Sequence, residues 1–164
     1  MDKKVVVING SGGVGKDTFV SLCGKYVKVI NVSSIDPYKE LLFKTGWDGI
    51  KNDKSRKTLS DLKNISIMFN DGPTNYVENK YHEFLLSDND IMFVHIREPE
   101  EIKKVVDRIN ALTLLITSKR IEKITSNKAD AKVLEYDYDD IISNDDTIEE
   151  LEIKAKSYVK KLVR

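Results

Sequence analysis

The chain has 164 residues, of which 40% are hydrophobic and 33% are charged, and its basic and acidic side chains cancel to a formal net charge of zero. These values are typical of one globular domain with a substantial core, and they exclude a strong overall field that would attract nucleic acid or an anionic membrane. One cysteine, Cys23, excludes a disulfide framework within the chain. We find no membrane-length apolar run and no signal peptide, and we expect a cytoplasmic protein.

The chain opens with an apolar run that leads into a glycine-rich loop. Residues 5–8 are apolar without alternation, which predicts a buried strand over 4–9. Residues 10–16, Gly-Ser-Gly-Gly-Val-Gly-Lys, fit the phosphate-binding pattern G-x-x-x-x-G-K, and a helical pattern follows over 16–25. Glycines let backbone N–H groups approach phosphate oxygens, while the helix N-terminus and the lysine add positive charge. The predicted nucleotide contacts in this stretch are Gly10, Gly12, Gly13, Val14, Gly15, Lys16, Asp17 and Thr18.

The last position of this pattern departs from the usual Ser or Thr. Asp17 stands there, and Thr18 follows it. Asp17 is either a favourable charge in the first helical turn or a magnesium ligand. Thr18 is either a helix hydroxyl bonded to its own backbone or a phosphate contact.

Three helices are predicted after a second strand over 26–32. Asp36 suits the cap and Pro37 the first turn of the helix that runs towards residue 46. A break at 70–73 separates the other two helices, and the third covers 77–85. The second of the three carries four apolar side chains on one face: Leu59, Leu62, Ile65 and Met68.

The rest of the chain continues the alternation of strands and helices. Strands are predicted over 91–96, 112–117 and 138–143, and the final helix over 148–162. Residues 118–133 are polar and lack a period, so we expect a mobile segment there. This alternation predicts an α/β fold with a parallel sheet covered on both faces and ligands at the carboxyl ends of its strands.

The loop and two later features resemble the P-loop kinases of small molecules. Gly-Lys-Asp-Thr at 15–18 is similar to the deoxynucleoside monophosphate kinases and the animal-type phosphomevalonate kinases, and more distantly to adenylate kinase. Such kinases often carry Asp-hydrophobic-Arg at the end of the third strand, where this chain has 95–97, His-Ile-Arg, and they close with Asn and an acidic helix start, as at 144–151. The resemblance implies a single P-loop NTPase domain over 1–164, three-layer α/β/α with a five-stranded parallel sheet.

The resemblance also assigns roles outside the loop. It implies that 33–88 binds the acceptor, that 118–133 forms a lid, and that ATP and Mg²⁺ are required. The implied catalytic residues are Lys16, Arg97 and Asp17. Arg120 and Asn144 join the nucleotide site, and the implied acceptor contacts are Ser34, Asp36, Lys39, Arg56 and Arg97. Asp17 and Asp36 are the candidate magnesium ligands, and the alternative for Arg97 is a surface ion pair with Glu101.

His95 departs from the family pattern, which has a carboxylate near magnesium at this position. Histidine is a poor ligand for a cation that prefers oxygen. Either Asp17 or Asp36 takes over this task, or catalysis is weak, or the substrate is unusual.

One further motif, which would indicate a GTPase, is rejected. Residues 127–130, Asn-Lys-Ala-Asp, resemble the guanine-reading motif of GTPases, but they do not follow directly on a buried strand, and the chain has no Asp-x-x-Gly switch motif.

From the loop and the resemblance we predict an ATP-dependent kinase of a small phosphorylated acceptor, above all a (deoxy)nucleoside monophosphate. The alternatives are a phosphomevalonate-like or other small-metabolite kinase and a nucleotide-binding protein with little turnover. The oligomeric state is left open.

Overall fold

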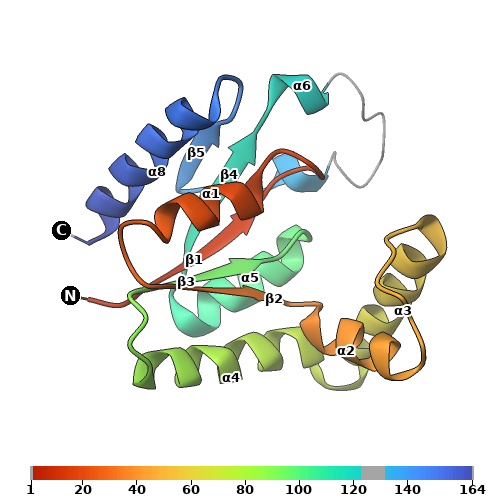
Figure 1. The fold of residues 1–164 in the computed structure, drawn as a ribbon. Coiled ribbons are helices and arrows are strands. Elements are labelled where there is room, and N and C mark those ends of the chain that lie inside the picture. Colours follow the sequence, from red (N-terminus) through yellow and green to blue (C-terminus); the bar gives the residue numbers. More distant parts are fainter. Residues whose placement is uncertain (1, 123–131, 164) are drawn as a thin grey trace.

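A computed structural model describes residues 2–122 and 132–163 (Figure 1). All five strands are parallel and form one sheet in the order β2-β3-β1-β4-β5. Val7 of the central strand pairs with Val94 on one side and with Thr113 on the other. The strands are β1 (Lys4–Asn9), β2 (Val29–Ser33), β3 (Ile91–His95), β4 (Leu112–Thr117) and β5 (Asp140–Ser143). The predicted α/β class, with the loop strand at the centre of a parallel sheet, is confirmed.

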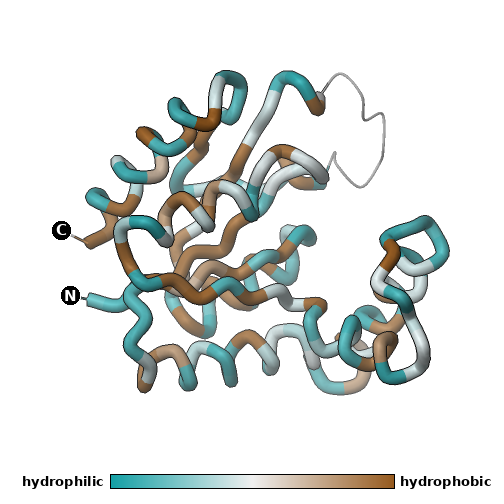
Figure 2. Tube along the Cα trace, in the orientation of Figure 1, coloured by the Kyte–Doolittle hydropathy of each residue, from teal (hydrophilic) through white to brown (hydrophobic). Residues whose placement is uncertain are grey.

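Helices cover both faces of this sheet. α1 (Lys16–Cys23) and α8 (Ile148–Leu162) pack on one face, while α4 (Gly72–Leu86) and α5 (Pro99–Ile109) pack on the other (Figure 1). Because side chains alternate along a strand, Val6 of β1 enters the core under α1 and Val7 enters the core under α5. Figure 2 shows the apolar strands at the centre and mixed helices around them. The three-layer α/β/α arrangement is therefore confirmed.

The stretch between β2 and β3 divides into two parts. α4 belongs to the body of the fold, because its Val77 and Phe84 side chains are completely buried. α2 (Asp36–Lys44) and α3 (Asp53–Asn70) instead extend beyond the carboxyl edge of the sheet (Figure 1). The predicted apolar face of α3 is only partly buried: Leu59 is covered, but Ile65 and Met68 are 64% and 87% exposed.

Among the predicted boundaries, the starts of two strands are wrong, as is one predicted cap; the helix predicted over 16–25 also ends at Cys23, and the one predicted over 77–85 begins at Gly72. β2 begins at Val29 rather than at residue 26, because the N–H groups of Lys25 and Tyr26 bond to carbonyls of α1 and complete a turn there. β5 begins at Asp140 rather than at residue 138. Ile35, not Asp36, is the N-cap residue of α2; Asp36 is the first helical residue, and its Oδ2 accepts from the backbone N–H of Ser33.

The segment after β4 is described only in part. A short helix, α6 (Lys119–Glu122), follows the strand, and a 3-10 turn, η1 (Lys132–Glu135), precedes β5. Most of the predicted lid and the whole motif at 127–130 lie outside the described residues. Across the two described ranges, no helix is both long and apolar enough to span a membrane.

Candidate nucleotide-binding site

The glycine-rich loop joins β1 to α1 at the carboxyl edge of the sheet, the edge where parallel α/β sheets bind ligands. Gly13 and Gly15 have φ angles of +82° and +98°, and Gly15 is the N-cap residue of α1. At Gly10, a Cβ would lie 2.5 Å from the carbonyl oxygen of Ile116 in β4. Glycine is therefore required by backbone conformation at two loop positions and by the neighbouring strand at Gly10.

Lys16 directs its charge back over the loop. Its Nζ donates to the carbonyl oxygens of Gly10 and Ser11, at 2.5 and 3.2 Å. Lys16 is also the first residue of α1, whose N-terminal N–H groups carry a partial positive charge. A full charge and a helix N-terminus therefore meet at the loop, and this is the arrangement that binds anions.

Arg97 lies against the same loop. Its Nη2 is 3.9 Å from the position that a Cβ on Gly12 would occupy. Its backbone carbonyl accepts from Nδ2 of Asn9, at 3.1 Å, and Asn9 Oδ1 in turn accepts from the N–H of Gly10. The buried Asn9 amide thus ties the end of β3 to the start of the loop. We did not single out Asn9 from the sequence, although a polar residue that ends a fully buried strand was the available signal.

Asn144 supports the loop from the other side. Its Nδ2 donates to the carbonyl of Val14 at 2.8 Å, and its own carbonyl accepts from Arg120 at 3.2 Å. The structure therefore brings Arg120 and Asn144, both predicted nucleotide contacts, to the loop side of the sheet. The Asn144 amide group, however, bonds to the backbone of the loop.

Replacing Gly15 should test this packing. Alanine there would adopt φ near +98° and place its Cβ 2.6 Å from Asn144 Nδ2, so we expect Gly15→Ala to lower the free energy of unfolding by about 1–3 kcal/mol and to weaken ATP binding. Gly46→Ala is the control, because Gly46 has a φ of +100° with nothing within 4 Å of a Cβ. Urea unfolding and ATP titration separate the two effects. Equal ATP affinities in the two variants would contradict the packing argument.

Asp17 in the first turn of α1, Asn31 in the middle of β2 and His95 at the end of β3 lie close together. His95 Nε2 lies 2.6 Å from Asn31 Oδ1, so the imidazole donates to that amide, and it lies 3.6 Å from Asp17 Oδ1. Burial lowers the pKa of His95, while the Asp17 charge opposes this shift. The neutral imidazole of His95 and the amide of Asn31 therefore flank Asp17. Asn31 was not among the residues predicted from the sequence.

The Asp17 side chain could supply a small part of the ligands of a Mg²⁺ ion. The Asp17 side chain is 89% exposed at the edge that holds the loop, and Mg²⁺ beside phosphates usually takes one or two carboxylates and several waters. Within residues 2–122 and 132–163, no group of three or more His, Cys, Asp or Glu side chains is arranged to hold a metal. Phosphate oxygens and water would therefore supply most of the ligands.

The predicted acceptor residues are not all brought together. Asp36 lies just past β2, with its Oδ1 3.8 Å from Lys39 Nζ. Ser34 is buried, and its N–H donates to the carbonyl of His95. Arg56 instead stands exposed in the first turn of α3, 3.8 Å from the Asp53 carboxylate. The end of β2 thus collects three of the five predicted residues, and Arg97 lies at the loop.

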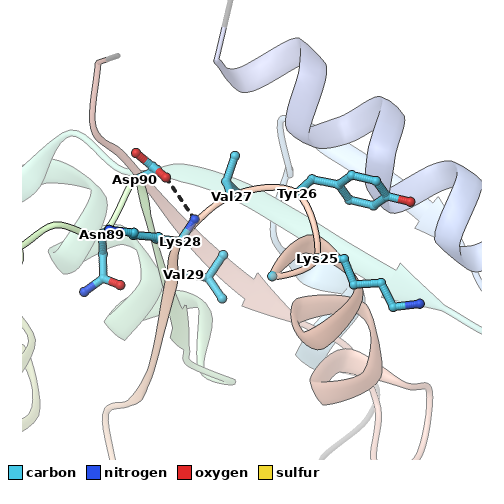
Figure 3. Close-up of a pocket in the computed structure, with 8 residues that line it drawn as sticks. Lys25, Tyr26, Val27, Lys28, Val29, Asn89 and Asp90 are labelled. Atoms are coloured by element: carbon cyan, nitrogen blue, oxygen red, sulfur yellow. Dashed lines mark hydrogen bonds between the residues drawn. The ribbon is translucent and has the colours of Figure 1, made fainter.

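A depression of about 580 Å³ lies at the opposite end of the sheet, between α1, β2 and the residues before β3 (Figure 3). Its polar groups have partners within the fold. The Lys25 and Tyr26 side chains both bond to Glu152 of α8, and the Lys28 N–H donates to Asp90. This depression lacks the loop and the paired cations of the carboxyl edge, so we place the candidate site at the loop.

No family model matches the sequence, and no curated protein matches it. Solved structures match along nearly the whole chain. A thymidylate kinase from Ehrlichia chaffeensis is 11% identical, with a TM-score of 0.59 and coverage of 97% of this chain and 100% of that one. A dephospho-CoA kinase from Campylobacter jejuni is 15% identical, with a TM-score of 0.52 and coverage of 98% and 97%. A shikimate kinase from Bacteroides thetaiotaomicron is 15% identical, with a TM-score of 0.50 and coverage of 96% and 98%. At these identities the likeness establishes the fold, that of P-loop kinases.

Proposed function

We propose that the chain is an ATP-dependent phosphotransferase that acts on a small phosphorylated acceptor, above all a (deoxy)nucleoside monophosphate. One observation carries this proposal: Lys16, the first residue of α1, and Arg97, which follows β3, lie against the same glycine-rich loop. Two cations at a phosphate-binding loop are suited to the charge that spreads over a transferring phosphoryl group. The structural neighbours, which are kinases of three different small molecules by name, support the reaction class and leave the acceptor open.

The donor half of the site follows from the loop. Backbone N–H groups of residues 12–16 would hold the β-phosphate of ATP, and the Lys16 ammonium would contact the β- and γ-phosphates. Thr18, exposed in the first turn of α1, would contact the α-phosphate. Arg120 and Asn144 would complete the nucleotide side of the site.

Mg²⁺, when bound with ATP, would neutralise phosphate charge and orient the transferring group. Asp17 and Asp36 are the residues that would hold it. The exposed Asp17 carboxylate is the better placed, because Asp36 already accepts from the Ser33 backbone. His95 and Asn31 would orient Asp17 without ligating the metal.

Residues 33–88 would build the acceptor half of the site. The chain 1–164 would act as one domain, and 118–133 would serve as the lid. Ser34, Asp36, Lys39 and Arg56 are the proposed acceptor contacts, and Arg97 would bind the acceptor phosphate bidentately. A phosphate acceptor is already anionic and needs no general base. Catalysis would then consist of positioning and charge stabilisation.

An acceptor panel tests this proposal. Purified protein with Mg-ATP and each (d)NMP, phosphomevalonate or shikimate should form ADP at a rate that depends on one acceptor class, and we expect the (d)NMPs to give it. Lys16→Ala is the matched negative control. If ATP binds and every (d)NMP is inert, the nucleoside monophosphate assignment is wrong.

A nucleotide-binding protein with little turnover is the second candidate. The observation that favours it is His95, which replaces an oxygen ligand with a neutral imidazole. ATP binding without ADP formation from any acceptor in the panel would support this reading.

A further inference from the structure

α3 buries a charged side chain and exposes apolar ones. The Lys63 side chain is only 7% exposed, whereas Met68 and Phe69 of the same helix are 87% and 84% exposed. A buried ammonium is costly unless it is paired. Lys63 Nζ donates to Glu98 Oε1, which supplies that partner. The ion pair therefore helps to decide which side of α3 faces the body of the fold.

Glu98 occupies a special place in this arrangement. It is the N-cap residue of α5, and it follows Arg97 directly in the chain. The Arg97 backbone is already held by the Asn9 amide at the start of the loop. Residues 97 and 98 are thus held by hydrogen bonds to two elements: Arg97 by Asn9 of β1, and Glu98 by Lys63 of α3.

A second lysine on α3 provides a contrast. Lys57 pairs with Asp61 at 2.6 Å, but these side chains are 76% and 56% exposed. Exposed pairs at this spacing contribute little to stability or orientation. The two lysines differ in burial and in the element that they contact, so they form a matched pair for experiment.

We propose that Lys63 is a positioning residue, and that the Lys63–Glu98 ion pair ties the acceptor-binding helix α3 to Arg97. This inference rests on the proposed function, in which α3 forms part of the acceptor site. The pair lies between α3 and the end of β3, while the loop at 10–16 holds the donor. Its loss should therefore displace the acceptor relative to Arg97 and leave ATP binding intact.

A double-mutant cycle tests the proposal. We expect Lys63→Met and Glu98→Gln each to lower kcat/KM for the acceptor by about a hundredfold, because small misplacements of a substrate are costly to phosphoryl transfer. The Kd for ATP should not change. The double variant should be no worse than either single variant, because one interaction is removed only once. Lys57→Met should match the unmodified protein in every measurement.

The outcomes that overturn the proposal are separate from failure of the proposed function. Single effects that multiply in the double variant, or an equal loss of ATP affinity, would overturn it. If the unmodified protein turns over no acceptor, the proposed function fails, and amide hydrogen exchange over 53–70 then tests the tie alone. If the amides of 53–70 exchange faster in Glu98→Gln but not in Lys57→Met, the tie between α3 and residue 98 is supported. If they exchange equally fast in both variants, the proposal is overturned. Glu98→Gln also carries the test if Lys63→Met does not fold, since the Glu98 side chain is 38% exposed.

Discussion

Lys16→Ala should lower the rate of ADP formation by about a thousandfold or more. The substitution removes the full positive charge that lies over the loop, where Nζ contacts the Gly10 and Ser11 carbonyls. Charge stabilisation of this kind supplies much of the rate in phosphoryl transfer. A coupled ADP assay measures the rate, and circular dichroism checks the fold.

Lys25→Ala is the matched control for this result. Lys25 follows α1 at the opposite edge of the sheet and pairs with the Glu152 carboxylate of α8 at 2.7 Å. Its loss should leave the rate unchanged. Equal rates for Lys16→Ala and the unmodified protein would contradict the assignment of the loop.

Arg97→Ala should also lower turnover by about a thousandfold, the magnitude expected of an arginine that stabilises a transferring phosphoryl group. ATP binding should survive, because the loop backbone and Lys16 stay in place. Arg97→Lys should recover little of the rate, since a lysine cannot form the bidentate contact of a guanidinium. Steady-state kinetics and ATP titration together measure this separation.

Arg108→Ala gives the comparison for Arg97. Arg108 lies in the last turn of α5 and bonds to Asn75 and Glu78 of α4. We expect it to affect stability and not turnover. If Arg97→Ala and Arg108→Ala turn over acceptor equally well, Arg97 has no part in phosphate binding.

The sheet and the loop could be predicted because their signals are local. β1 and β3 each contain an unbroken apolar run, at 5–8 and 91–94, and the pattern at 10–16 is a contiguous motif. The starts of β2 and β5 could not be located from the same signal. Tyr26 and Tyr138 look like strand residues, but both lie before the strands begin. Their hydroxyls donate to the Glu152 carboxylate of α8 and to the Val133 carbonyl of η1.

The contacts that tie distant segments together could not be predicted. Asn9 bonds to Arg97, and Lys63 bonds to Glu98, across long separations in sequence. No local period indicates that α3 turns Lys63 inward while Met68 stays exposed. Such pairings depend on how the helices dock against the sheet edge, and a single sequence contains no direct signal of that docking.

Asp17 is understood better from the structure than from the motif alone. The sequence left two alternatives, a favourable charge in the first helical turn and a magnesium ligand. Its carboxylate is exposed beside Asn31 and His95, with a 3.4 Å contact from Asn31 Nδ2. This placement favours the magnesium role that we propose.

Identification of the products tests the proposed phosphoryl transfer most directly. The protein is incubated with Mg-ATP and a (d)NMP, and the nucleotides are separated by anion-exchange chromatography. We predict that ADP and the corresponding nucleoside diphosphate appear in equal amounts and that both disappear with Lys16→Ala. ADP that forms without a diphosphate product, or the absence of both products while ATP binds, would contradict the proposal.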